Sequence, residues 1–81
     1  MATDLQLRAL RARRRLCRRY EYHLSRHGPD GVYAAGFTQR GLDGDYAITS
    51  SGYGPTPEVA ILAAAKAVRA LERAERERGP R

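Results

Sequence analysis

The apolar residues near the N-terminus recur at the period of an α-helix. They are separated by four, three and four residues, and the stripe that they form consists of Leu5, Ala9, Ala12 and Leu16. Thr3 or Asp4 can cap the N-terminus of this helix. The pattern predicts an amphipathic helix over about residues 4–19. Cys17 lies beside the stripe, so we expect it to be a core residue, as small free cysteines usually are.

From Tyr20 onward the apolar period changes to two, which is the pattern of a half-buried strand. Two more short strands are predicted in the segments VYAAGFT and YAITSS, each after a turn rich in glycine and aspartate. We expect Tyr33, Ala35 and Phe37 on one side of the second strand. Together the strands predict an antiparallel meander over about residues 20–51, which the segment GYGPTP ends.

The last predicted element is an alanine-rich helix over about residues 57–78. Thr56 as the cap and Pro57 at the first helical position are strong start signals. Apolar residues cover roughly half of its circumference, and because most of them are alanines, this face allows the helix to come close to a sheet. We expect Ala64 and Ala67 to lie at this close approach.

These elements predict an α+β fold in the order helix, strand, strand, strand, helix. Both helices should pack on one face of a three-stranded antiparallel sheet. With 81 residues the chain has room for a single domain over residues 1–81 and little room for a deep catalytic pocket. One cysteine and the lack of a long apolar run favour a soluble protein of the reducing cytoplasm, without a membrane partner.

The positive charge of the chain is concentrated in its first third. Residues 1–27 carry eight arginines against Asp4 and Glu21, which accounts for the whole net charge of +6. Six of these arginines are predicted to lie opposite the apolar stripe: Arg8, Arg11, Arg14, Arg15, Arg18 and Arg19. Like charges on one helix face repel each other, whereas a merely solvated face usually mixes signs. The basic face therefore predicts a contact surface for an anionic partner.

Further cations are expected on the solvent face of the alanine-rich helix, and the candidates there are Lys66, Arg69 and Arg73. Leu62 lies among them, and we predict that it joins a self-association or partner contact. His27, in the first predicted turn, is a further candidate contact. No histidine, cysteine and carboxylate cluster has catalytic or metal-ligand spacing, so the chain is predicted to be non-enzymatic, with no metal and no cofactor.

The region from Gly28 to Leu71 resembles a double-stranded RNA-binding domain. The similar segments are HGPDG between the first two strands, GYGPT before the last helix, and EVAILAAAKAVRAL within it. The resemblance implies that the first helix and the first inter-strand loop contact RNA. Pro57, Glu58 and Ile61 stand where that family places lysines at the start of its second helix.

The segments YEYHL, DGVYAAGF and GYGPTPEVAILAAAKAVRAL also resemble HicB-like antitoxins and small phage proteins of the anti-CRISPR type. This second resemblance implies a protein that acts by binding another protein.

Two functions therefore stay open. The first is a non-enzymatic module that contacts nucleic acid or a ribonucleoprotein through the arginine-rich helix. The second is a small phage or bacterial protein-binding inhibitor with no direct nucleic-acid contact, which uses the open sheet face or an edge strand. The expected partner is nucleic acid or an acidic protein, in the cytoplasm of a bacterial or phage-infected cell. A homodimer is also left open.

Overall fold

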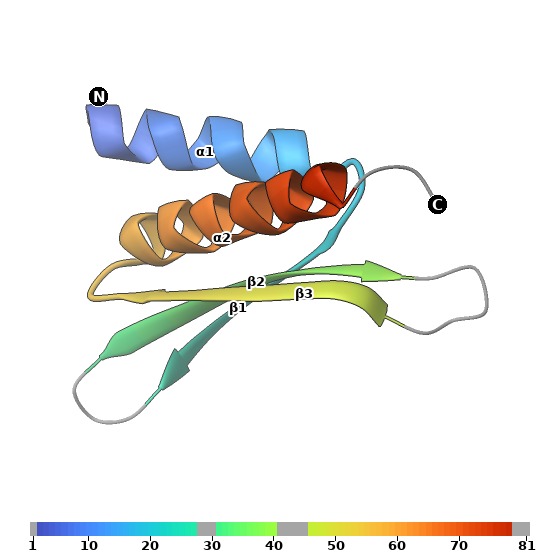
Figure 1. The fold of residues 1–81 in the computed structure, drawn as a ribbon. Coiled ribbons are helices and arrows are strands. Elements are labelled where there is room, and N and C mark those ends of the chain that lie inside the picture. The colour runs from blue at the N-terminus through green and yellow to red at the C-terminus, as the bar shows by residue number, and fades with distance from the viewer. Residues whose placement is uncertain (1, 28–30, 41–45, 79–81) are drawn as a thin grey trace.

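The computed structural model describes residues 2–27, 31–40 and 46–78, and for residues 27, 39, 40 and 46–49 the backbone alone. The elements along the chain are α1 (Asp4–Leu16), β1 (Glu21–His27), β2 (Val32–Arg40), β3 (Tyr46–Gly54) and α2 (Pro57–Glu77). This order confirms the predicted α+β fold, and Figure 1 shows both helices on one face of the sheet.

The sheet is an antiparallel meander in the order β1-β2-β3. Its register places Phe37 of β2 opposite Tyr22 of β1 on one side and Ser50 of β3 on the other. The rings of Tyr22 and Phe37 lie 5.5 Å apart on the face that the helices cover. As predicted, Ala35 and Phe37 are buried on that face and Tyr33 packs against the same core.

Helix α1 begins with a capping box and ends earlier than expected. The Thr3 hydroxyl accepts from the Gln6 amide at 3.1 Å, and the Gln6 side chain accepts from the Thr3 amide at 2.9 Å. At the other end, the Leu16 carbonyl accepts from the amides of Arg19 and Tyr20, which turns the chain toward β1. The helix therefore stops at Leu16, and Arg18 and Arg19 lie in the following turn.

The prediction that Cys17 is a core residue was wrong, because its thiol-bearing side chain is exposed. Cys17 is the C-cap of α1 and stands at the start of the turn. The turn instead directs Tyr20 into the core, where only 6% of its surface is exposed. The prediction assumed that the helix continues to residue 19, which would keep Cys17 beside the apolar stripe. Because α1 ends at Leu16, this assumption fails.

Helix α2 passes very close to β3 at Gly52. A Cβ atom at Gly52 would lie 2.6 Å from the Ala60 carbonyl oxygen and 2.7 Å from the Ala63 carbonyl carbon. Nearby, the Ser50 hydroxyl donates a hydrogen bond of 3.3 Å to the Ala64 carbonyl. Ala64 is completely buried at this contact, as expected.

Ala67, which was expected at the same close approach, is half-buried. The expectation that GYGPTP ends the sheet was also wrong in part, because β3 continues to Gly54. Both glycines of the strand lie against α2: a Cβ atom would meet the helix backbone at Gly52 and the Val59 side chain at Gly54.

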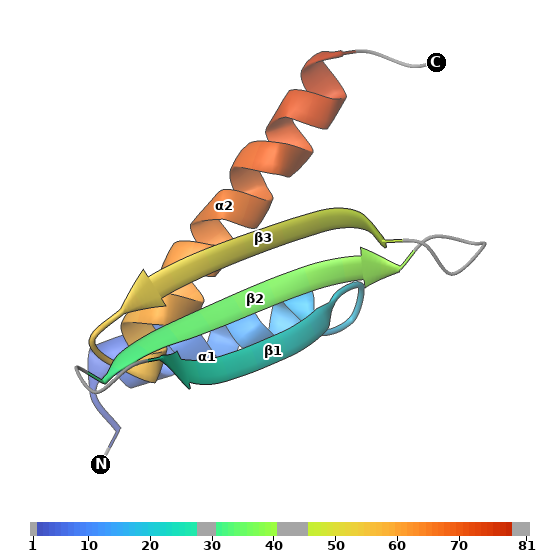
Figure 2. The ribbon, with the colours of Figure 1, turned by 90° about the horizontal axis from the view of Figure 1, so that it is seen from below.

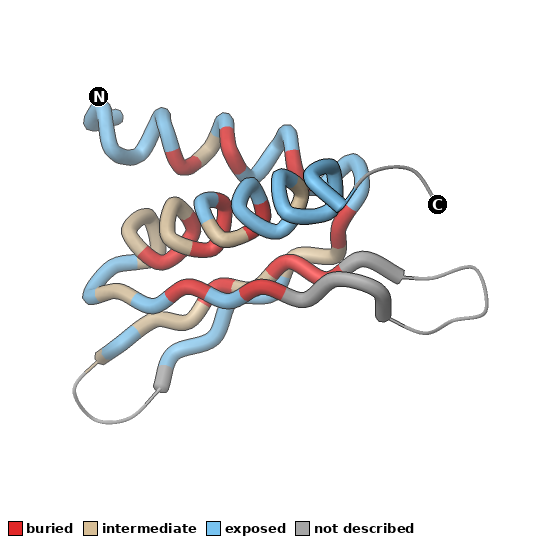
Figure 3. Tube along the Cα trace, viewed as in Figure 1, coloured by how far each residue is buried: buried red, intermediate tan, exposed pale blue. Residues whose placement is uncertain are grey.

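The core fills the layer between the helices and the sheet (Figure 3). Among the residues whose side chains the structure describes, the core contains Ala9, Ala12, Leu16, Tyr20, Ala35, Phe37, Ala60, Ile61, Ala64, Ala65 and Val68. Six of these eleven residues are alanines, so the elements approach one another closely instead of filling the space with large side chains. Neither described helix is long and apolar enough to cross a membrane.

A polar contact joins the turn after α1 to the second half of α2. The Tyr20 hydroxyl donates to Glu72 Oε2 at 2.9 Å, and the Arg19 guanidinium donates to the same oxygen at 2.8 Å. Burial raises the pKa of Tyr20, and the hydrogen bond to Glu72 raises it further. The contact therefore helps to hold α1 beside α2.

We expect Gly52→Ala to lower the free energy of unfolding by ~1–3 kcal/mol, because the added methyl group would overpack the backbone of α2. Chemical denaturation with urea measures this loss. Gly36→Ala is the matched control: its Cβ would lie 3.4 Å from the Ser50 carbonyl oxygen, an ordinary contact. If Gly52→Ala is as stable as Gly36→Ala, then α2 does not approach β3 as described.

We expect Tyr20→Phe to cost about 1 kcal/mol of stability through the lost hydrogen bond, and Arg19→Gln to cost about 0.5 kcal/mol or less, because that ion pair is exposed.

The raised pKa of Tyr20 also predicts a pH dependence. Above pH 10.0, the ordinary pKa of a tyrosine side chain, the unfolded chain loses the phenol proton first, so stability falls as the pH rises. Denaturation at several alkaline pH values should show a shallower fall for Tyr20→Phe, and an unchanged fall would contradict the assignment.

Candidate functional site: a cationic groove between the helices

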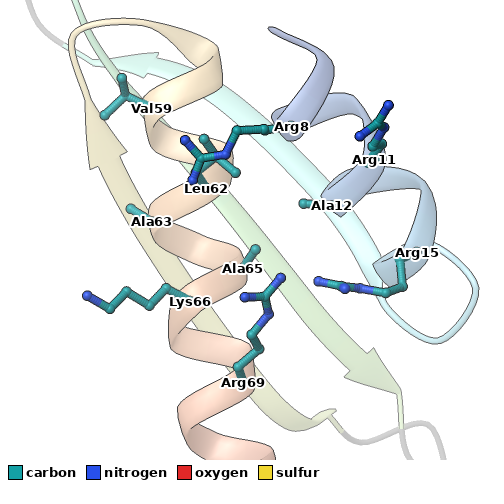
Figure 4. A pocket seen from close by; sticks show the side chains of 10 residues that line it. All are labelled: Arg8, Arg11, Ala12, Arg15, Val59, Leu62, Ala63, Ala65, Lys66 and Arg69. Carbon is teal, nitrogen blue, oxygen red and sulfur yellow. The ribbon is translucent and has the colours of Figure 1, made fainter. Parts of the chain in front are cut away.

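A groove of about 640 Å³ runs between α1 and α2 on the side of the molecule away from the sheet (Figure 4). Cations from both helices line it, and they are Arg8, Arg11, Arg15, Lys66 and Arg69. The remaining lining residues are apolar, namely Ala12, Val59, Leu62, Ala63 and Ala65. We call this feature the interhelical groove.

Helical spacing explains why these side chains meet. Arg8, Arg11 and Arg15 follow one another at intervals of three and four residues, so they form one row along α1. The same intervals relate Leu62, Lys66 and Arg69 on α2. The row on α1 flanks Ala12, whose small side chain is buried against α2 and lets the two rows face each other.

The described lining of the interhelical groove carries one sign of charge. No acidic residue is part of it, and the ion pair between Arg19 and Glu72 lies outside the groove. The apolar lining reduces the local dielectric response and so strengthens the attraction for an anion. A concave surface with one sign of charge concentrates anionic partners.

The single arginine face expected from the sequence is divided in the structure. Of its six members, Arg8, Arg11 and Arg15 line the interhelical groove. Arg14 and Arg18 are exposed on the outer side of α1 and the turn, and neither lines the groove. The division arises because the arginines occupy a wide arc of the helix, of which α2 faces one side.

Arg19 was predicted to contact an anionic partner, but its guanidinium is held by Glu72 and lies 5.7 Å from the Tyr20 ring centre. On α2, Lys66 and Arg69 are brought to the groove, whereas Arg73 lies one turn beyond its lining. His27 was placed in a turn by its sequence context. Its backbone is instead the last of β1 and pairs with Val32, and its side chain lies outside the described part of the structure.

The helical pattern placed Leu62 on the solvent-exposed face of α2, but in the structure it is partly buried. It packs against the core and lines the groove among the cations, facing α1. Sequence reasoning missed the apolar lining formed by Val59, Ala63 and Ala65. The unusual position of Leu62 among basic residues was the only signal of this lining.

A second hollow, of about 200 Å³, lies between α1, β1 and the start of α2. Its lining is mostly apolar and includes charges of both signs, Arg13 and Glu58. Arg13 lies 5.7 Å from the ring centre of Tyr22, so its charge is partly engaged by the aromatic face. This hollow therefore lacks the one-sided charge of the interhelical groove.

No group of three or more potential metal ligands occurs among the residues that the structure describes. Comparison with known protein families, curated proteins and solved structures finds no match to this chain.

The groove predicts stabilisation by multivalent anions, because a ligand that binds only the folded state raises the free energy of unfolding. Inorganic pyrophosphate at ten times its Kd should add about 1.4 kcal/mol, which corresponds to roughly 5–10 °C in the thermal midpoint. Arg15→Gln/Arg69→Gln should lose most of this increase at matched ionic strength. An equal increase in wild type and variant would mean that the anion acts elsewhere.

Proposed function

We propose that this protein is a non-enzymatic module that binds nucleic acid, or a ribonucleoprotein, through its phosphate backbone. The observation that carries the proposal is the convergence of five cations from two helices on one groove without an acidic lining residue. Four of the five are arginines, whose planar guanidinium groups donate paired hydrogen bonds to phosphate oxygens. The cytoplasm of a bacterial or phage-infected cell is the compartment that we propose.

The chemistry of the groove favours backbone contacts over base recognition. Its polar groups are all cationic donors, and phosphate oxygens are pure acceptors. None of the lining residues is aromatic, so the bases have no stacking platform there. Binding should therefore depend strongly on salt and weakly on sequence. Arg14 and Arg18 would extend the positive field beyond the groove and accelerate encounter.

The test is the salt dependence of nucleic-acid affinity. The slope of log affinity against log salt is about −0.7 for each phosphate neutralised on a single strand and about −0.9 on duplex DNA. Arg11→Gln/Arg15→Gln should therefore make the slope shallower by roughly 1.4 to 1.8. Fluorescence anisotropy at several salt concentrations measures it.

Arg76→Gln/Arg78→Gln is the matched control, because it removes the same charge from the exposed end of α2, outside the groove. It should leave the slope nearly unchanged. No binding at low salt would reject nucleic acid as the partner.

One observation favours the second function, a protein-binding inhibitor of the anti-CRISPR or antitoxin type. The sheet face away from the helices is open (Figure 1), and it carries Tyr53 and Val32 with 63% and 38% of their surfaces exposed. Such a partner would give a complex that survives nuclease and depends weakly on salt. Tyr53→Ser would weaken that complex and leave nucleic-acid binding unchanged.

A further inference from the structure

We infer that the interhelical groove receives one unpaired nucleic-acid strand and does not bind a duplex in the same way. This inference rests on the proposed function and names the form of nucleic acid that the site fits. It follows from the combined width of the two helices, the direction of Arg8, Arg15 and Arg69, and the nature of the lining.

The two helices form a unit too wide to enter a duplex groove. Packed helices lie ~8–10 Å apart, and each is ~10–12 Å across with its side chains. The major groove of B-DNA, about 12 Å wide, admits one helix, and the major groove of A-form RNA is narrower still. A duplex would therefore rest on the outer side of α1, near Arg14 and Arg18, and leave the interior of the groove unfilled.

Arg8, Arg15 and Arg69 point into this interior, whereas Arg11 and Lys66 line the groove with their heads directed away from the opposite helix (Figure 4). Figure 4 shows Arg8 and Arg15 extended from α1 toward α2, and Arg69 extended from α2 toward α1. Their guanidinium groups therefore flank the space between the two helices from both sides. From Arg8 to Arg15 this space follows seven residues of α1, which corresponds to ~10.5 Å along the helix axis. A flexible strand can lie between the two rows, with phosphates reached from both sides.

The apolar lining supports the same conclusion. Leu62 and Ala65 line the groove from α2, and Ala12 lines it from α1 (Figure 4). An unpaired strand can cover these side chains with its sugars and base edges, whereas a duplex keeps its bases stacked inside. Because the polar lining groups are all cations that contact phosphates, the contact is tolerant of sequence, so any unstructured strand is a suitable probe.

The experiment compares a short fluorescein-labelled oligothymidylate with the duplex that it forms with oligoadenylate. Anisotropy at low salt gives the affinity of the full chain for each. Wild type should bind the single strand about tenfold or more tightly than the duplex. The groove variant Arg15→Gln/Arg69→Gln should lose about tenfold or more in single-strand affinity, with a salt slope shallower by about 1.4.

The rim variant Arg14→Gln/Arg18→Gln removes the same charge from exposed positions outside the groove. This variant should lose less single-strand affinity than the groove variant does. It should lose most of its affinity for the duplex, because the duplex is expected to rest on Arg14 and Arg18. Circular dichroism and the thermal midpoint verify that each variant is folded.

A second pair of variants tests whether the strand passes Leu62, by comparing a charged with a neutral side chain of the same size at this position. Leu62→Glu should bind the single strand much more weakly than Leu62→Gln, because only the glutamate places a negative charge in the groove. Leu71→Glu places the same charge on α2 outside the groove, at a residue with 39% of its surface exposed, and should have a small effect.

Equal or tighter binding of the duplex, or equal losses in the groove and rim variants, would overturn the single-strand inference while the proposed function stands. Failure of both nucleic acids to bind at low salt would reject the proposed function itself. Polyglutamate could also compete with the labelled oligothymidylate for the groove. If it competes as effectively as unlabelled oligothymidylate at equal charge concentration, the groove would be assigned to an acidic protein instead.

Discussion

The close passage of α2 over β3 at Gly52 determines where everything above the sheet lies. A side chain at this position would meet the backbone of the helix, so the strand and the helix axis are held at a separation that only small residues permit. Ala60 and Ala64 provide the matching small side chains on α2. Helix α2 packs on β3 and β2, and α1 packs against α2 on the same face of the sheet (Figure 2). The buried residues of α1 are Ala9, Ala12 and Leu16.

The interhelical groove is a consequence of this arrangement. Because Ala12 and Ala65 are small, the helices meet through their buried sides and leave the longer residues to form two walls above them. The cations on these walls repel one another, which costs a few tenths of a kcal/mol per close pair. The contact of Arg19 and Tyr20 with Glu72 opposes this repulsion by fastening the end of α1 to α2. An anionic ligand would remove the repulsion, so binding and stability are coupled.

The charge of the molecule is also divided unevenly between the two helices. The excess of arginine lies in α1 and the turn that follows it, while α2 carries both signs. The glutamates of α2 are concentrated toward its C-terminal half, and one of them is used by the contact with Arg19. The part of α2 that lines the groove precedes most of these glutamates. It therefore contributes cations to the lining and no acidic residue.

The sequence by itself determined the element types, their order and most of their bounds, because periods of 3.6 and two and the capping residues Thr3, Thr56 and Pro57 are local properties of the chain. It also determined that the excess positive charge lies on α1. Only the tertiary structure decided which arginines share a concave surface, that Cys17 is exposed and that Leu62 lies in the groove. A helical pattern specifies an inner and an outer face, but the groove is made by two helices that are about fifty residues apart in the chain. Their relative position depends on how closely Gly52 and the core alanines allow backbones to approach, and no periodicity records that distance.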